Sequence, residues 1–291
     1  MKCKKCGKKA IAHLKAYGIA LCEECYSDFY IRLVKRSIKR YRIMKKNERV
    51  LAAVSGGKDS SAMAAVLKEL GYDFEMFYID LGIGEYSEES ERTVKNLSEF
   101  LDVDLNIVRL KEYGFTISEL RRKWRRKTCS GCGIAKRYIM NRFARENSFD
   151  VVATGHTVED IVSFYLKNVA GGTKIWVEKL LPRNEPFDEK IVARAKPMFE
   201  ISEKENMLFV LIRNIPFTMA DCPYAPKPEW KEIIYEIERR KPGFSKNFVR
   251  GLLAKKHEFQ EIRHCSVCGE ISNSDICAFC RLRSSVGDFH L

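Results

Sequence analysis

The sequence predicts an α/β protein with a doubly wound, Rossmann-like parallel sheet, flanked by a zinc knuckle at each end. Three observations lead to this prediction. Short β-rich runs alternate with amphipathic stretches between residues 48 and 215, a glycine turn follows the first such run, and cysteines gather in Cys-x-x-Cys pairs near both ends. The 291 residues suffice to close one medium-sized core, so we exclude a disordered, collagenous or coiled-coil chain.

Cysteine spacing predicts the two terminal modules. Ten of the 11 cysteines fall into five Cys-x-x-Cys pairs. Such a turn presents two thiolates on one side of a tight loop, and two turns complete the tetrahedral shell of a structural Zn²⁺ ion. We expect zinc fingers in residues 1–26 and 261–291, whose ligands are Cys3, Cys6, Cys22, Cys25, Cys265, Cys268, Cys277 and Cys280. Redox dithiols are the alternative, but they normally occur singly beside a βαβ unit.

A basic linker helix is expected at 27–47, where apolar residues recur at close to helical spacing among lysines and arginines. The whole chain carries 52 lysines and arginines against 39 aspartates and glutamates, a net charge of +13. This excess favours a polyanionic partner such as nucleic acid. A solvated outer helix face is the alternative interpretation, and a membrane surface is disfavoured because the apolar face is small.

Residues 48–215 alternate as a parallel α/β sheet requires. Strands are predicted at 49–54, 74–80, 105–110 and 151–154, with helices near 59–70, 87–101, 133–147 and 158–169. A proline-rich loop around Cys222 follows, and further helices are predicted at 229–240 and 245–256. We therefore assign a catalytic domain to 48–215 and a C-terminal helical extension, which carries Cys222, to 216–260.

The glycine turn reads Ser55-Gly56-Gly57-Lys58-Asp59-Ser60. Adjacent glycines let backbone amides converge on phosphate oxygens, and the following helix adds its positive N-terminal end. Lys58 would offset phosphate charge, the hydroxyls of Ser55 and Ser60 would donate hydrogen bonds, and Asp59 would hold Mg²⁺. An ordinary strand-to-helix turn is the alternative. The sequence Gly-x-x-x-x-Gly-Lys-Ser/Thr of P-loop NTPases does not occur here.

This turn resembles the PP-loop of N-type ATP pyrophosphatases, which cleave ATP between its α- and β-phosphates. The resemblance implies that adenine lies near Ile79, at the end of the second strand. It also implies that the segment beginning Gly155-His156 brings Gly155 and Asp160 to the nucleotide. The pair Glu159-Asp160 is a mild departure from the family pattern. We give His156 no catalytic role.

Three cysteines, Cys129, Cys132 and Cys222, lie outside the two predicted zinc fingers. Three thiolates leave one position open, which suits a 4Fe-4S cluster whose fourth iron takes an exogenous ligand. In the alternative mechanism, Cys132 or Cys222 carries a persulfide and the other resolves it as a disulfide. The run 121–127, with Trp124 inside it, is strongly basic and suits RNA stacking, although a solvated helix face is also compatible with it.

The complete set of motifs is specific for one family. The paired zinc knuckles, Ser-Gly-Gly-Lys-Asp-Ser, Cys-Ser-Gly-Cys-Gly-Ile-Ala-Lys-Arg-Tyr-Ile-Met-Asn and the late Cys222 together resemble the TtuA branch of the TtcA/TtuA tRNA 2-thiolation enzymes. The resemblance implies that Cys129, Cys132 and Cys222 hold an oxygen-sensitive 4Fe-4S cluster. The implied nucleotide contacts are Ala53, Ser55, Gly56, Gly57, Lys58, Asp59, Ser60, Ile79, Lys136, Gly155 and Asp160.

The resemblance also implies the reaction. ATP would adenylate the C2 oxygen of a tRNA uridine, and sulfur delivered at the cluster would displace AMP, giving 2-thiouridine or 5-methyl-2-thiouridine, AMP and pyrophosphate. Catalysis is assigned to Cys129, Cys132, Cys222, Lys58 and Asp59. The expected sulfur donor is a ubiquitin-like carrier protein with a C-terminal thiocarboxylate. The Lys-Arg-Tyr sequence favours position 54 in the T-loop over the anticodon wobble uridine.

Two other functions stay open at this point, a PP-loop tRNA ligase with an amine nucleophile and a zinc-knuckle RNA-binding module. A cytoplasmic location is expected, because apolar runs such as 62–67 are far shorter than the roughly 20 residues of a bilayer span and no apolar signal core follows Met1. A homodimer is one assembly compatible with these features.

Overall fold

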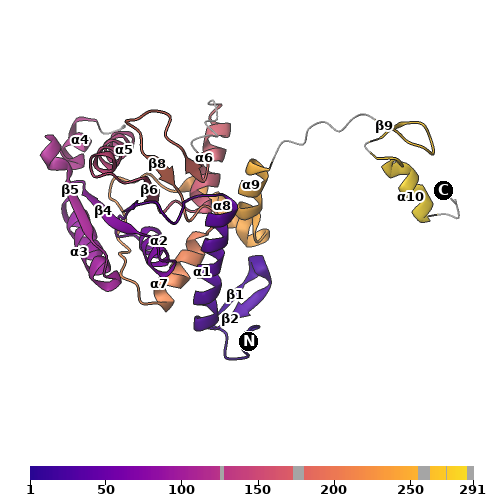
Figure 1. Cartoon of the computed structure of the whole chain (residues 1–291), viewed down its shortest axis with the longest axis horizontal. Coiled ribbons are helices and arrows are strands. Elements are labelled where there is room, and N and C mark those ends of the chain that lie inside the picture. Colours follow the sequence, from indigo (N-terminus) through magenta and orange to yellow (C-terminus); the bar gives the residue numbers. More distant parts are fainter. Residues whose placement is uncertain (125–127, 173–179, 255–262, 273, 287–291) are drawn as a thin grey trace. The chain divides into compact units, whose positions relative to one another are not determined.

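The computed structural model describes residues 1–124, 128–172, 180–254, 263–272 and 274–286 (Figure 1). The chain forms two compact units, Met1–Arg250 and Gly251–Leu291. None of the helices within the described ranges combines the length and apolarity needed to cross a bilayer.

A six-stranded sheet with the order β5-β4-β3-β6-β8-β7 lies at the centre of the first unit. All neighbours are parallel except β7, which pairs antiparallel with β8. The strands are β3 (Val50–Ala53), β4 (Phe74–Asp80), β5 (Leu105–Arg109), β6 (Val151–Thr154), β7 (Arg183–Asn184) and β8 (Ala193–Ala195). The four expected strands are confirmed. Sequence reasoning missed β7 and β8, because two or three residues are too few to show a strand periodicity.

Helices connect these strands as a doubly wound sheet requires. The chain runs outward through β3, β4 and β5 and then returns to place β6 beside β3. Because parallel crossovers are right-handed, this reversal puts the helices of the two halves on opposite faces of the sheet. The connecting helices are α2 (Lys58–Glu69), α3 (Gly84–Leu101), α4 (Ile117–Lys123), α5 (Thr128–Glu146) and α6 (Val158–Ala170). The predicted fold class is therefore confirmed.

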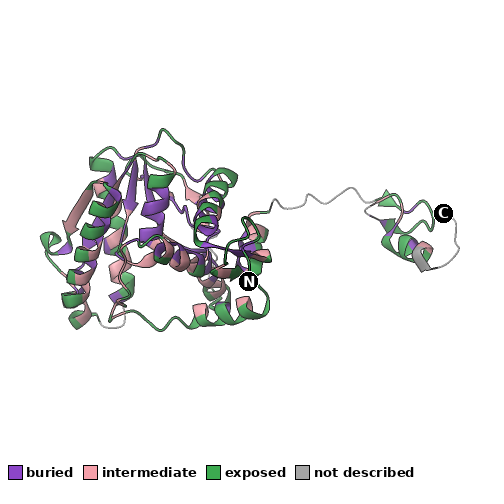
Figure 2. Ribbon diagram, turned by 90° about the horizontal axis from the view of Figure 1, so that it is seen from below, coloured by how far each residue is buried: buried purple, intermediate pink, exposed green. Residues whose placement is uncertain are grey.

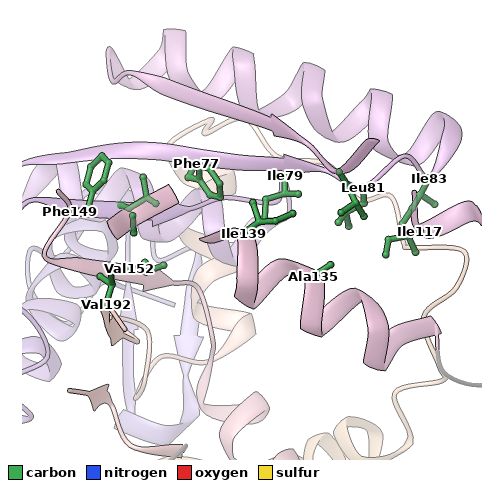
Figure 3. Close-up of a cluster of buried hydrophobic side chains, with 13 residues drawn as sticks. Phe77, Ile79, Leu81, Ile83, Ile117, Ala135, Ile139, Phe149, Val152 and Val192 are labelled. Atoms are coloured by element: carbon green, nitrogen blue, oxygen red, sulfur yellow. The ribbon is translucent and has the colours of Figure 1, made fainter. Parts of the chain in front are cut away.

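Helix α5 begins five residues earlier than the predicted range of 133–147. Its first turns therefore include Cys129 and Cys132, which are three residues apart and so lie on one side of the helix. The helix is fixed by a buried cluster on the adjacent face of the sheet (Figure 3). Strand residues of this cluster include Leu51, Phe77, Ile79 and Val152, and α4 and α5 supply Ile117, Ala135, Ile139 and Ala144.

The N-terminal segment is a β-hairpin followed by a long helix. Strands β1 (Ala12–Leu14) and β2 (Ile19–Leu21) flank the short helix η1 (Lys15–Tyr17), and α1 (Glu23–Arg40) follows. Helix α1 begins and ends earlier than the basic helix expected at 27–47. It ends at Arg40, two residues before Arg42, whose φ of 50° does not continue a helix. Tyr26 and Tyr30 of α1 are fully buried.

Three further helices follow in the chain. Helix α7 (Glu203–Ile212) packs against both α1 and α2, and α8 (Glu229–Arg240) packs against α6. Helix α9 (Phe244–Leu253) follows, and the end of its predicted range, 255–256, lies outside the described residues. The sequence missed α7, predicted α8 with its exact bounds of 229–240, and placed α9 only approximately, at 245–256. Figure 2 shows the inner strands of the sheet as mostly buried, which holds for β3, β4 and β6, and the outer surfaces of the surrounding helices as exposed.

The second unit is small. Its described elements are β9 (Arg263–His264), β10 (Ile271–Ser272) and α10 (Ala278–Val286). The buried side chains at its centre are Cys265, Cys277 and Cys280, with Ile276 packed beside them. A core made of thiols is too small to stabilise this unit by apolar burial alone, so a metal ion would have to supply much of its folding free energy.

Candidate nucleotide and thiol site

A cavity of about 410 Å³ opens at the carboxyl ends of β3, β4 and β6. This is the point where the order of the strands reverses, which is the usual ligand crevice of an open α/β sheet. Nine residues of the predicted nucleotide set line it, namely Ala53, Ser55, Gly57, Asp59, Ser60, Ile79, Lys136, Gly155 and Asp160. Their common location shows that segments distant in sequence meet in one cavity.

Two predicted contacts, Gly56 and Lys58, are not among the lining residues. Gly56 instead shapes the loop. Its φ is 83°, and a Cβ there would lie 3.3 Å from the carbonyl oxygen of Ser90. The hydroxyl of Ser60 closes the turn, because it accepts from the Ser55 amide at 3.1 Å and donates to the Gly57 carbonyl at 2.9 Å. The loop is thus held in shape before any anion binds.

Gly155 lies against the start of α2. A Cβ at this position would lie 3.0 Å from the backbone N and Cα of Ser60 and 3.1 Å from the carbonyl carbon of Asp59. These are backbone atoms of the PP-loop helix and cannot move aside cheaply. The glycine in the Gly155-His156 segment is therefore required for close approach of the β6 loop to α2, a reason that the sequence alone did not reveal.

Lysines and carboxylates alternate beside the cavity. Lys58 Nζ lies 3.0 Å from both Asp59 Oδ2 and Glu203 Oε2. Lys231 Nζ lies 2.7 Å from Asp160 Oδ1 and 2.5 Å from Glu203 Oε1. Burial opposes the charge on Lys58, but the two carboxylates more than compensate and raise its pKa. Asp160 and Glu203 likewise raise the pKa of Lys231 against the effect of burial. Both lysines therefore stay charged, and a bound polyphosphate would either replace the carboxylates as their partner or bind beside them.

The structure explains why the pair Glu159-Asp160 departs from the family pattern. Burial raises the pKa of Glu159 to about 8, and its Oε2 accepts from the Glu203 amide at 3.1 Å. Glu159 is 4% exposed and does not line the cavity, whereas Asp160 does. Burial raises the pKa of Asp160 as well, but Lys231 and His156 hold it below its ordinary value. Glu159, the residue that differs from the family pattern, thus supports α7, and Asp160, which matches the pattern, lines the cavity.

The loop after residue 215 brings Cys222 to this site. Its Thr218 amide donates to the Gly56 carbonyl at 2.8 Å, and Thr218 forms a parallel bridge with Gly57. Farther along, the Tyr224 carbonyl accepts from the Cys129 thiol at 3.3 Å. Cys222 lies between these two anchors. The loop is therefore fixed to the PP-loop at one end and to the start of α5 at the other.

Cys132 and Cys222 both pack against the buried cluster beneath α5, and Tyr86 packs there too. Burial raises the pKa of Cys132, Lys136 opposes this, and the nearby Cys222 and Cys129 thiols raise it further. Tyr86 also lines the nucleotide cavity. Sequence reasoning missed Tyr86 and Thr218, because neither lies in a motif. His156 lines the cavity as well, with Nδ1 2.8 Å from Thr154 Oγ1.

The other eight cysteines form two four-thiol clusters, one near each end of the chain. Within each cluster the ligand atoms lie within 4.8 Å of one another. Sulfur pairs are separated by 3.5 Å for Cys6 and Cys22 and by 3.7 Å for Cys268 and Cys277. Tetrahedral zinc with Zn–S bonds of 2.3 Å requires a separation of about 3.8 Å. The four-thiol geometry therefore fits a single tetrahedral ion.

Amide donors also support thiolates in these clusters. The amides of Val267 and Cys277 donate to Cys265 Sγ at 3.4 and 3.3 Å. The Cys277 contact is the main cause that lowers the pKa of Cys265 to about 6. Among the described residues, no other group of three or more potential ligand atoms is as compact. Cys129, Cys132 and Cys222 are thus near one another but more widely spaced than the ligands of one ion.

The basic run before α5 is only partly described, because residues 125–127 lie outside the described ranges. Arg121, Arg122 and Lys123 end α4, and Trp124 follows with 60% of its surface exposed. The Arg121 guanidinium lies over the Tyr224 ring at 5.5 Å. This surface therefore borders the Cys222 loop and offers both an exposed aromatic ring and positive charge.

The fold and the glycine turn define a PP-loop nucleotide-binding protein. The family model "PP-loop domain" matches residues 30–205, and "2-thiouridine synthetase TtuA, N-terminal LIM domain" matches residues 2–27. The chain is 42% identical to a tRNA-5-methyluridine(54) 2-sulfurtransferase of Pyrococcus horikoshii, over 97% of this chain and 93% of the relative. A Thermotoga maritima protein of the same name is 36% identical, over 98% and 97%. The chain belongs to the PP-loop tRNA 2-sulfurtransferase family.

A solved structure supports the same assignment. The "U34-tRNA thiolase NcsA from Methanococcus maripaludis with its [4Fe-4S] cluster" superposes with a TM-score of 0.75 at 27% identity. It covers 100% of this chain and 98% of that chain. The resemblance stated from the motifs is thereby confirmed for the fold, the nucleotide-binding domain and the family.

Proposed function

We propose that this protein is an ATP-dependent tRNA sulfurtransferase that replaces the C2 oxygen of uridine 54 by sulfur. The observation that carries the proposal is the Cys222 loop, which is anchored to the PP-loop through Thr218 and to Cys129 through Tyr224. A nucleotide site and a thiol site thereby share one loop. The names of the relatives from Pyrococcus and Thermotoga supply the target position.

In the first half of the reaction, ATP would occupy the cavity and transfer AMP to the uridine C2 oxygen. Loop amides and the N-terminal end of α2 would hold the phosphates, and Lys58 would neutralise charge on the leaving pyrophosphate. Asp59 would hold Mg²⁺. The proposed nucleotide contacts are Ala53, Ser55, Gly56, Gly57, Lys58, Asp59, Ser60, Ile79, Lys136, Gly155 and Asp160. Each well-placed donor of this type is worth about 3 kcal/mol in other enzymes.

In the second half, sulfur would attack C2 and AMP would leave. The thiols of Cys129, Cys132 and Cys222 suit a 4Fe-4S cluster, because they are too widely spaced for one ion and they leave a fourth position without a protein ligand. When bound, such a cluster supplies an open iron that takes an exogenous sulfur. Lys136, one helical turn beyond Cys132, would hold negative charge between the thiols and the nucleotide.

The partners follow from the same proposal. The substrate is tRNA, and the exposed Trp124 and the basic end of α4 suit its unpaired bases and phosphates. A ubiquitin-like carrier protein with a C-terminal thiocarboxylate would deliver the sulfur. We assign the reaction to the cytoplasm. We propose the same domains as the sequence predicts, with the boundaries 1–26, 27–47, 48–215, 216–260 and 261–291. A homodimer is one candidate assembly.

Position mapping tests the proposed function. Anaerobic incubation of the protein with ATP, Mg²⁺, sulfide and unmodified tRNA should release pyrophosphate and add sulfur at nucleotide 54. Mass spectrometry of nuclease fragments locates the added sulfur. Thiolation at the wobble uridine, position 34, is the second candidate, because the superposed structure is named a U34-tRNA thiolase. ATP turnover without any thiolated tRNA would contradict both candidates.

We also propose that each four-thiol cluster holds one Zn²⁺ ion. Replacing Cys268 by serine should lower the zinc content from two ions per chain to one, because serine is a poor ligand for this soft site. The second unit should then lose its folding free energy and become protease-sensitive, while residues 1–250 stay resistant. Elemental analysis and limited proteolysis measure the two effects. Unchanged zinc content in Cys268→Ser would contradict the assignment.

A further inference from the structure

A chain of hydrogen bonds links helix α1 to the PP-loop through helix α7. The hydroxyl of Tyr30 donates to Asn206 Oδ1 at 2.6 Å, and Asn206 Nδ2 donates to Asp59 Oδ1 at 2.8 Å. Tyr30 and Asn206 are both 0% exposed. Water cannot replace a partner at this depth, so each group depends on the next one in the chain.

The two bonds fix the orientation of the Asn206 amide. Its oxygen accepts from Tyr30, and its nitrogen therefore faces Asp59. The reversed amide would set its oxygen against the Asp59 carboxylate, and two acceptors repel each other. The other oxygen of Asp59, Oδ2, faces Lys58 Nζ at 3.0 Å. Asp59 is thus held at both oxygens, by a neutral donor on one side and a cation on the other.

We propose that Asn206 and Tyr30 are positioning residues, which aim the Asp59 carboxylate for Mg²⁺ and ATP and so couple the N-terminal helix to the nucleotide site. This inference rests on the proposed function, because Asp59 is the residue assigned there to Mg²⁺. Neither residue lines the cavity, so both act through Asp59. Neither belongs to a motif that the sequence analysis identified.

Helix α1 is well suited to carry this contact. It begins directly after Cys22 and includes Cys25, so the N-terminal thiol cluster holds its first turn. The Tyr30 ring stacks on Phe209 of α7 with a centroid distance of 4.1 Å. One turn earlier, the Tyr26 hydroxyl donates to the Glu205 carbonyl at 2.8 Å. The helix is therefore pinned to α7 at two successive turns, and only the second contact leads to Asp59.

Tyr26 provides a matched control. Tyr26→Phe and Tyr30→Phe each delete one hydroxyl from a fully buried ring on the same face of α1, and each breaks one hydrogen bond to α7. Both variants should show a similar fall in melting temperature. Only Tyr30→Phe should raise the Mg²⁺ concentration for half-maximal ATP binding, by about fivefold, the factor expected for one lost hydrogen bond. Asn206→Leu should raise this Mg²⁺ concentration more strongly, by about 30-fold relative to the wild type.

The measurement is calorimetric titration of ATP into the full-length protein at graded Mg²⁺ and also in EDTA. ATP affinity in EDTA should be the same in Tyr30→Phe and in the wild type, because Asp59 acts through the cation. General damage to the site would instead weaken ATP binding with and without Mg²⁺. Equal Mg²⁺ dependence in the two tyrosine variants, or no shift in Tyr30→Phe, would overturn the inference.

The same experiment separates this inference from the proposed function. If Tyr30→Phe shifts the Mg²⁺ dependence but the wild type forms no thiolated tRNA, the positioning role stands and the proposed function fails. If the wild type thiolates tRNA and the two tyrosine variants behave alike, only the positioning role fails. A wild-type protein that does not bind ATP with Mg²⁺ overturns both.

Discussion

Replacing Cys222 by serine should lower the rate of tRNA thiolation by at least about 1,000-fold, the scale of loss when one member of a catalytic unit is removed. Serine is neither a soft iron ligand nor a sulfur carrier, so it fails in the cluster mechanism and in the persulfide mechanism alike. ATP affinity should stay within about twofold, because Cys222 does not line the nucleotide cavity and the loop is anchored through Thr218 and Tyr224. Quantified thiouridine and calorimetric ATP titration measure the two effects.

The variant also discriminates between the two sulfur mechanisms. Anaerobically purified wild-type protein should contain about four irons per chain and absorb broadly in the visible range, and Cys222→Ser should lose both. Wild-type protein with full activity and no iron would instead favour the persulfide. Met219→Ala is the matched control, since Met219 lies on the same loop and is 73% exposed. It should retain wild-type thiolation. Wild-type rates in Cys222→Ser would remove this thiol from the mechanism.

Replacing Gly155 by alanine should weaken ATP binding by about 10- to 100-fold, because overpacking a tight contact costs about 1–3 kcal/mol. The added Cβ would lie 3.0 Å from the Ser60 backbone and 3.1 Å from the Asp59 carbonyl carbon. The start of α2 must then shift away from β6, and the N–H groups of the loop no longer all point at the phosphates. Thiolation should fall at least as much. Calorimetric ATP titration and tRNA thiolation assays measure the losses.

Gly251→Ala is the control for this substitution. Gly251 lies within α9, where an added Cβ meets no described atom within 4 Å outside the backbone of its own helix. Alanine is a better helix former than glycine, so stability should stay the same or rise by up to about 1 kcal/mol. ATP affinity should not change. If Gly155→Ala binds ATP as the wild type does, the close approach of β6 to the PP-loop is not required for the nucleotide site.

Local patterns determined which elements form. The run before Ser55 is a buried strand and the run after Gly57 is a helix, and both follow from periodicity and from the glycine turn between them. Short strands such as β7 and β8 carry too few residues for a pattern. The beginning of α5 was also placed too late, because Gly131 and Gly133 hide the helical signal around Cys129 and Cys132.

The cysteines show the same difference between what local sequence patterns predict and what only the tertiary structure decides. Pair spacing alone predicted the four-thiol clusters, because each cluster is formed by two nearby turns, and the structure brings those thiols together. The spacing of Cys222 from Cys132 says nothing about their distance in space. Their proximity depends on the Thr218 bridge to Gly57 and on the contact of Tyr224 with Cys129.

The sequence by itself determined the fold class, the family, the glycine turn and the inventory of thiols, because these depend on neighbours in the chain. Only the tertiary structure decided that Gly155 must lack a side chain, that Glu159 is buried away from the cavity that Asp160 lines, and that Tyr30 is linked to Asp59 through Asn206. Those features join segments that are far apart in the sequence, by 176 residues for Tyr30 and Asn206 and by 147 for Asn206 and Asp59. Their energies come from close packing and buried hydrogen bonds, which no local pattern encodes.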